Sequence, residues 1–199
     1  MSKVYNIIAG INGAGKTSLY SIINNKYDLG ERVNIDEIVK KYGDWHDTLL
    51  QIKAGRSAMD MINTYIERGI TFHQETTLPG ATIIKQIKKA KSCGYTIRLF
   101  FVGIDDVTVA IERVHKRIAM GGHGIDDDVI EKRYRKLPET LRVLLPLCDI
   151  VIMYDNTVRF RQVTFIKDNV IEDYDPMIPK WLKELIDADI RKVRKWNTE

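Results

Sequence analysis

Short hydrophobic runs alternate along the chain with longer segments in which apolar residues recur at the spacing of a helix. The helical pattern is clearest over residues 49–68 and 83–90, and Gly69 and Gly94 stand where these helices would end. The strand-like runs are residues 4–9, 33–35, 70–73, 95–102 and 150–153. This alternation predicts an α/β fold in which helices flank a central, mostly parallel five-stranded sheet.

The pattern changes after Asp155. Residues 162–166 and 170–171 flank Lys167-Asp168-Asn169, which is typical of a two-stranded hairpin at the edge of a sheet. Residues 179–196 place apolar side chains on one helical face, and we favour a packing helix with a solvated basic face over a nucleic-acid-binding one. We therefore expect a single domain, 1–199, that ends in a hairpin and a helix over about 157–199.

Composition narrows the class of protein. Hydrophobic residues make up 44% of the 199 residues and charged residues 29%, and no stretch approaches the roughly 18 apolar residues of a membrane helix. The apolar run 4–11 is too short for a signal peptide core, so we expect a cytoplasmic protein. The net charge of +4 is spread along the chain, which suits small anionic substrates and argues only weakly for nucleic acid. Cys93 and Cys148 are expected to be buried free thiols.

One glycine-rich motif carries the strongest chemical signal. Residues 10–17, here called the phosphate loop, match GxxxxGK[ST] between a hydrophobic strand and a helical segment. The loop amides would surround a β-phosphate, Lys16 would reach the β and γ oxygens as a catalytic residue, and the Thr17 hydroxyl would bind Mg²⁺. The motif predicts a P-loop NTPase fold with ATP and Mg²⁺ as cofactors. Nucleotide contacts are expected from Gly10, Asn12, Gly13, Ala14, Gly15, Lys16, Thr17 and Ser18.

Three other nucleotide-binding classes are disfavoured. Residues 25–28 spell the NKxD of GTPases, but they follow the first helix and not a late strand. A dinucleotide fold needs GxGxxG, and Ser18 occupies its third glycine position. A transporter-type ATPase would need an LSGGQ-like signature and an acidic pair closing a late strand, and the sequence has neither.

Polar residues after the second and third strands predict an acceptor site beyond the carboxyl ends of the sheet. Asp36 is placed to accept a proton from an attacking hydroxyl, although it could also cap the helix that follows. Glu75 could bind acceptor hydroxyls or a water on magnesium, and Thr77 could orient the acceptor. The alternative for Thr76 or Thr77 is that it caps a turn before Pro79.

A cationic helix predicts a lid over about residues 105–128. Arg113 and Arg117 are four residues apart on a helix expected over 106–120, so they project side by side. The glycine-rich residues 121–124 could let this segment close over phosphates, where arginines neutralise charge on the transferred group. The alternative is a solvated charged face shared with Glu112 and Lys116.

Taken in order, these motifs resemble the zeta toxin family of P-loop kinases, in particular its compact chromosomal members, often labelled predicted ABC-type ATPases. The resemblance is carried by residues 9–17, 33–36, 75–78, 113–117, 121–123, 133–134 and 155–156. It implies ATP-dependent phosphorylation of UDP-N-acetylglucosamine at a sugar hydroxyl. Asp36 would then be the base, Glu75 and Thr77 would hold the acceptor, and Arg113 with Arg117 would bind the phosphates.

The sequence also departs from that family in two places. Residues 78–80 and 125–127 differ from the small-residue and Val-Pro-Glu patterns expected there, which leaves the acceptor's identity open. The resemblance likewise leaves open an epsilon-like antitoxin partner. Residues 155–156 are a candidate neighbourhood for the adenine ring.

Three functions therefore compete. The first is a metabolite kinase, in which Asp36→Asn abolishes transfer but not ATP binding. The second is a nucleotide-triggered regulatory protein, in which the same substitution is nearly silent. The third is a kinase for another nucleotide-linked metabolite or a polynucleotide end; polynucleotide binding would depend steeply on salt.

Overall fold

A computed structural model describes residues 3–42, 48–78, 80–122 and 124–189. The strands are β1 (Val4–Ala9), β2 (Glu31–Val33), β3 (Phe72–Thr76), β4 (Thr96–Gly103), β5 (Ile150–Asp155), β6 (Arg161–Lys167) and β7 (Val170–Tyr174). The helices are α1 (Lys16–Ile23), α2 (Ile35–Tyr42), α3 (Thr48–Arg68), α4 (Ala81–Ser92), α5 (Val107–Ala119), α6 (Asp127–Leu144) and α7 (Lys180–Asp189), with a short 3-10 helix at Leu145–Leu147. The predicted C-terminal helix extends to residue 196, and its part beyond 189 lies outside the described residues.

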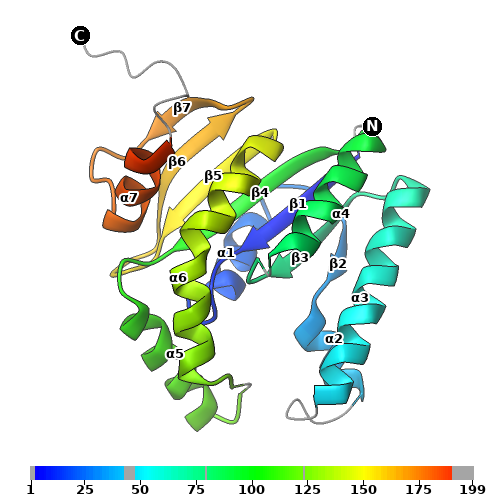
Figure 1. Ribbon diagram of the computed structural model, residues 1–199, viewed down its shortest axis with the longest axis horizontal. Coiled ribbons are helices and arrows are strands. Elements are labelled where there is room, and N and C mark those ends of the chain that lie inside the picture. The colour runs from blue at the N-terminus through cyan, green and yellow to red at the C-terminus, as the bar shows by residue number, and fades with distance from the viewer. Residues whose placement is uncertain (1–2, 43–47, 79, 123, 190–199) are drawn as a thin grey trace.

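All seven strands form one sheet in the order β2-β3-β1-β4-β5-β6-β7 (Figure 1). β1 to β5 pair in parallel, while β6 and β7 pair antiparallel and extend the β5 edge. The predicted five-stranded parallel sheet and C-terminal hairpin are therefore confirmed. Two strand boundaries were misplaced: β2 ends at Val33 and β3 runs on to Thr76.

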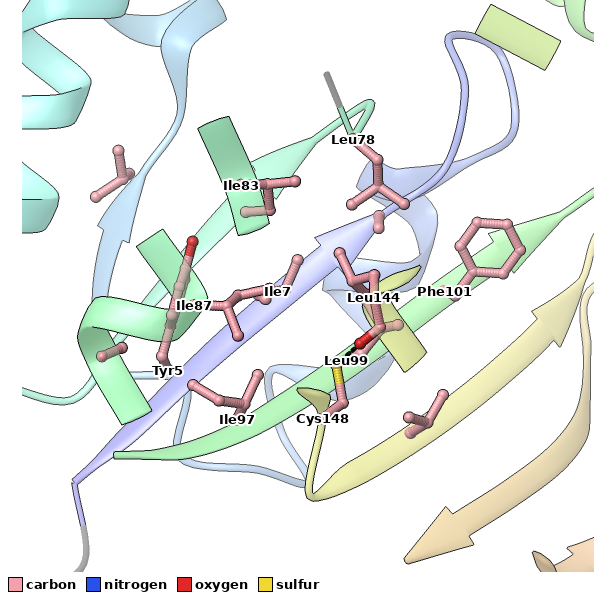
Figure 2. Close-up of a cluster of buried hydrophobic side chains, with 14 of the residues drawn as sticks. Tyr5, Ile7, Leu78, Ile83, Ile87, Ile97, Leu99, Phe101, Leu144 and Cys148 are labelled. Atoms are coloured by element: carbon pink, nitrogen blue, oxygen red, sulfur yellow. Dashed lines mark hydrogen bonds between the residues drawn. The ribbon is translucent and has the colours of Figure 1, made fainter. Parts of the chain in front are cut away.

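β1, β4 and β5 are buried on both faces of the sheet, which explains why these strands are almost continuously hydrophobic. α4 and α6 lie over one face in Figure 1, and α1 lies behind the other. On the first face, Ile83 and Ile87 of α4 and Leu144 of α6 surround side chains of β1 and β4 (Figure 2). On the second face, α1 and α5 pack on a separate cluster that includes Ile8, Phe100 and Ile152.

The two predicted free thiols differ in burial. Cys148 is buried, and burial raises the pKa of its thiol to about 12. Cys93 is only half-buried, so that part of the expectation was wrong. No helix within the described residues is both long and apolar enough to cross a membrane.

The topology determines where a ligand can bind. β1 lies between β3 and β4. After β1 the chain forms β2 and β3 on one side of it, and then crosses to form β4 and β5 on the other side. In such sheets the crevice lies outside the carboxyl ends of the strands, at this switch point. The loop that leaves β1 at that edge is the phosphate loop, and its Gly10 N–H donates to the Thr76 carbonyl at the end of β3 (3.3 Å).

Candidate active site

The phosphate loop adopts a conformation that needs glycine. Gly13 and Gly15 have φ angles of 78° and 107°, in the region that side chains disfavour. A Cβ on Gly13 would lie 2.3 Å from the Ala110 carbonyl oxygen of α5. A Cβ on Gly15 would lie 2.5 Å from the Asn156 amide nitrogen. The loop is thus packed against α5 and the segment after β5. It leads directly into the N-terminus of α1.

Lys16 is held at the loop. Its Nζ donates to the carbonyl oxygens of Gly10 (3.0 Å) and Ile11 (3.1 Å), so the ammonium lies against the first two loop residues. Thr17 and Ser18 follow in the first turn of α1, both exposed at the helix N-terminus. The first amides of a helix have no partner within the helix, and together with the helix dipole they favour an anion here.

Two side chains from distant segments contact the loop from outside. Arg133 of α6 donates from Nη1 to the Asn12 side-chain oxygen (2.5 Å). Asn156, just after β5, donates from Nδ2 to the Ala14 carbonyl oxygen (2.8 Å). The loop is therefore fixed between α6 and the segment that follows β5.

Glu75 lies in β3 beside the phosphate loop and is largely buried, with 8% of its side chain exposed. Its Oε1 accepts hydrogen bonds from Arg32 of β2 (2.6 Å) and from Asn34 (3.0 Å). Glu75 pairs in register with Ile8, whose side chain packs on the α1 face of the sheet. The carboxylate therefore lies on the same side of the sheet as α1.

The partner of this carboxylate, Arg32, packs on aromatic rings. The Arg32 guanidinium lies over the Tyr20 ring of α1, 4.5 Å from its centroid, and Tyr20 stacks on His73 at 5.3 Å. Burial lowers the pKa of His73, so its imidazole favours the neutral form. A neutral His73 adds no positive charge beside Arg32.

The turn after β3 distinguishes two neighbouring threonines. Thr76 accepts the Leu78 N–H on its hydroxyl (3.0 Å), so for Thr76 the turn-capping alternative is confirmed. Leu78 has a φ of 57°, unusual for a branched side chain, and this bond stabilises that conformation. Thr77 is half-buried between them and stays a predicted acceptor contact.

Asp36 lies in the second position of α2, three residues beyond the end of β2. The prediction that Asp36 stands at the tip of the strand was therefore wrong. The helix is capped by Asn34, whose carbonyl accepts from Ile38 N–H (3.1 Å) and whose side-chain oxygen accepts from Glu37 N–H (3.4 Å). The capping alternative for Asp36 was thus wrong, and its side chain lies outside the described residues.

The helix predicted to act as a lid is α5, and its two arginines are half-buried. Arg113 Nη2 donates to the Thr157 carbonyl oxygen (3.4 Å), beside Asn156. Arg113 Nη1 and Arg117 Nε are buried and have no hydrogen-bond partner among the described residues. Unpaired buried donors are uncommon in folded proteins and call for an acceptor. Glu112 and Lys116, named with the alternative of a solvated charged face, are exposed, so both interpretations of α5 stay open.

Both ends of α5 are fixed. Asp106 accepts the Thr108 N–H at the N-terminus (2.8 Å), and this bond lowers the pKa of the Asp106 carboxyl. At the other end the N–H groups of Gly121 and Gly122 bond the carbonyls of Ile118 and Arg117. The predicted glycine stretch thus begins as a helix cap, while His123 lies outside the described residues.

The contacts of three residues were not predicted from the sequence. Arg133 was noted only within the family pattern, Asn156 was noted there and as a candidate neighbour of the adenine ring, and Arg32 was not noted at all. A basic residue or amide on a helix or loop carries no local signal of the partner it meets 121 or 142 residues away. For Arg32 the signal was available, since it stands two residues from Asn34 on a strand that ends at the same edge as Glu75.

Comparisons with known proteins identify a family and a relative of this chain. The family model described as Zeta toxin matches residues 1–170. An uncharacterized protein of Haemophilus influenzae is 33% identical over 125 residues, which make up 63% of this chain and 88% of that protein.

Solved structures share the fold at low sequence identity. A chain of the PezAT chromosomal toxin-antitoxin system of Streptococcus pneumoniae has a TM-score of 0.61 at 16% identity, over 96% of this chain and 86% of that one. A putative kinase from Chloroflexus aurantiacus has a TM-score of 0.58 at 19% identity, over 79% and 90%. The AvrRxo1-ORF1:ORF2 structure with ATP has a TM-score of 0.63 at 10% identity, over 92% and 63%. The predicted P-loop NTPase fold is confirmed.

Proposed function

The chain belongs to the zeta toxin family, and from this premise we propose that it is an ATP-dependent kinase. It would transfer the γ-phosphoryl group to a hydroxyl of a small nucleotide-linked acceptor, with UDP-N-acetylglucosamine as the first candidate. The observation that carries the proposal is the phosphate loop, which brings Lys16 to the switch point of the sheet and is held by Arg133 and Asn156.

The residues present fit a triphosphate. The loop amides and the N-terminus of α1 favour phosphate oxygens, and Lys16 supplies a mobile positive charge for the β and γ positions. The buried N–H groups of Arg113 and Arg117 need acceptors, and the oxygens of the transferred group could supply them. Arg133 adds a fourth cation, which contacts the loop at Asn12. The ATP-bound AvrRxo1 structure, which shares the fold, supports ATP as the nucleotide.

Mg²⁺ fits the same edge. The exposed Thr17 hydroxyl at the start of α1 would bind it, and the Glu75 carboxylate on the α1 side of the sheet would hold a water of its hydration shell. Bound there, the ion would neutralise charge on the β and γ phosphates. Glu75 already accepts two hydrogen bonds on one oxygen, which suits a positioning role better than proton abstraction.

We assign the base to Asp36. It lies in the first turn of α2, beyond the end of β2, so its backbone is at the edge where an acceptor would bind. A carboxylate there can take the proton of the attacking hydroxyl while Thr77 orients the acceptor. Because residues 78–80 and 125–127 depart from the family pattern, the acceptor has to be determined by experiment. The toxin-antitoxin neighbour makes an antitoxin partner worth testing by co-purification.

One assay tests the proposal. Purified chain is incubated with Mg²⁺, γ-labelled ATP and a panel of UDP-sugars, free nucleotides and oligonucleotides, and the products are analysed by mass spectrometry. We expect one added phosphate on a UDP-sugar and none with Lys16→Ala. Transfer to oligonucleotide ends would favour the polynucleotide alternative. ATP binding with no transfer to any acceptor would favour a regulatory protein.

A further inference from the structure

Trp181, at the start of α7, packs against the carboxyl end of β4. Its ring lies edge-on to Phe101, with centroids 5.3 Å apart. A Cβ on Gly103 would lie 2.4 Å from the Trp181 ring, so glycine leaves the room that the indole fills. Trp181 is thus fixed beside the strand end that leads into Asp105 and the lid helix.

Two hydrogen bonds connect Trp181 to carboxylates at this edge. Its backbone N–H donates to Asp105 Oδ1 (2.8 Å), which supplies an acceptor for the first turn of α7. Its indole Nε1–H donates to Asp155 Oδ1 (3.1 Å), and Asp155, the last residue of β5, is only 5% exposed. The other carboxylate oxygen, Oδ2, lies 3.6 Å from Arg161 Nε, so the indole is a hydrogen-bond donor to Oδ1 of a carboxylate whose charge Arg161 balances. A buried carboxylate depends on such partners, because an unpaired charge at this depth is costly.

From Asp155 the network continues into the nucleotide side of the site. Thr157 Oγ donates to Asp155 Oδ1 (2.7 Å) and accepts the Asp105 N–H (3.0 Å). The Thr157 carbonyl accepts from Arg113 of the lid (3.4 Å). Asn156, between Asp155 and Thr157, donates to the Ala14 carbonyl of the phosphate loop (2.8 Å). The segment 155–157 is therefore shared by α7, the lid and the phosphate loop.

We propose that Trp181 is a positioning residue for the nucleotide site. By holding Asp155, it fixes the segment 155–157 and so sets Arg113 and the phosphate loop in place. This inference rests on the proposed function. It concerns an element outside residues 1–170, the range that the family model matches.

The direct test removes the indole donor and retains an aromatic ring. Trp181→Phe is compared with wild type in calorimetric ATP titrations. We expect a dissociation constant for ATP raised about tenfold, as for the loss of a hydrogen bond to a charged group. Leu185→Val is the matched control: it trims a buried side chain of the same helix and leaves the network intact. It should lower the melting temperature and leave the ATP affinity unchanged.

A double-mutant cycle tests whether the effect of Trp181 passes through the hydrogen bonds of Asp155 and Thr157. Thr157→Val removes the next link in the network, and Trp181→Phe should have little further effect in that background. Unchanged ATP affinity in Trp181→Phe, or equal losses in Trp181→Phe and Leu185→Val, would overturn the inference.

Hydrogen exchange separates this inference from the proposed function, because it needs no nucleotide. We expect Trp181→Phe to speed exchange in the phosphate loop and at residues 156–157, and Leu185→Val to speed it only in α7. If wild type binds no ATP, the proposed function fails, and exchange still decides whether Trp181 positions these segments. Exchange that changes in α7 alone would refute the positioning role.

Discussion

The proposed nucleotide half and the proposed acceptor half of the site are built differently. The nucleotide half centres on eight consecutive residues whose main chain forms the site, and distant side chains such as Arg133 only hold it. The acceptor half is assembled from side chains of β2, β3 and α2, for example Arg32 and Glu75, which are 43 residues apart. A site made of main chain depends on glycine geometry, whereas a site made of side chains depends on how the strands pair.

This difference bears on specificity. Backbone amides bind any phosphate chain of the right shape, so the nucleotide half suits a whole class of kinases. The acceptor half depends on which side chains stand at the strand ends, and there this chain departs from its family at residues 78–80. We therefore expect substitutions in the nucleotide half to weaken ATP binding, and those in the acceptor half to affect transfer or acceptor choice.

The largest effect should come from Lys16→Ala. Removing the ammonium that the loop holds should lower the rate of transfer on the order of a thousandfold and weaken ATP binding, as for other preorganised charges. Steady-state transfer assays and ATP titrations measure the two effects. Lys85→Ala, on the exposed surface of α4, is the matched control. Transfer retained in Lys16→Ala would remove the nucleotide half from the account.

Asp36→Asn should separate the two halves. Without a base, transfer should fall about a hundredfold or more, while ATP affinity stays near that of wild type. The same assays apply, with Asp60→Asn on the exposed face of α3 as the control. Equal activity in Asp36→Asn and wild type would exclude Asp36 as the base and favour a regulatory protein.

Arg133→Met tests whether the contact to Asn12 belongs to the nucleotide half. Loss of a charge-assisted bond to the loop should lower kcat/KM by about 10- to 100-fold. Arg135, two residues on and paired with Glu131 at the surface, gives the control variant Arg135→Met. If both variants behave alike, Arg133 has no specific part in the site.

In the acceptor half, Arg32→Met should cost stability as well as transfer. Glu75 would keep its buried carboxylate without its cationic partner, and we expect the free energy of unfolding to fall by about 1–3 kcal/mol. Urea unfolding measures this change, with Arg56→Met on the exposed surface of α3 as the control. A double variant, Arg32→Met with Glu75→Gln, should recover part of the loss. No recovery would mean that Arg32 acts through its stacking on Tyr20 alone.

The smallest predicted effect concerns pH. Burial lowers the pKa of His73 from its ordinary 6.5, so below that pH the unfolded chain binds a proton that the folded chain resists. The free energy of unfolding should therefore fall as the pH drops from neutral through 6.5 toward the lower folded value. His73→Gln should reduce this slope relative to wild type. An unaltered slope in His73→Gln would contradict a buried neutral imidazole beside Arg32.

The two halves also differed in how far the sequence predicted them. The phosphate loop and its flanking strand and helix follow from contiguous residues, because glycine and lysine at fixed offsets have few other uses. The family follows from several such short motifs in order along the chain. The bonds of Glu75 to Arg32 and Asn34 depend on the register of β2 against β3, which periodicity does not specify. Periodicity also misplaced the end of β2. The run of residues 33–35 predicts a strand, but Asn34 caps a helix that begins at Ile35. Nothing in the sequence around Trp181 indicates that its indole N–H donates to Asp155.

The central claim is that the phosphate loop binds the triphosphate of ATP through Lys16. Calorimetric titration of the wild-type chain with ATP in the presence of Mg²⁺ tests it most directly, with Lys16→Ala alongside. We predict one saturable site whose affinity depends on Mg²⁺ and is largely lost in Lys16→Ala. Absence of binding, or equal binding by both proteins, would contradict the account.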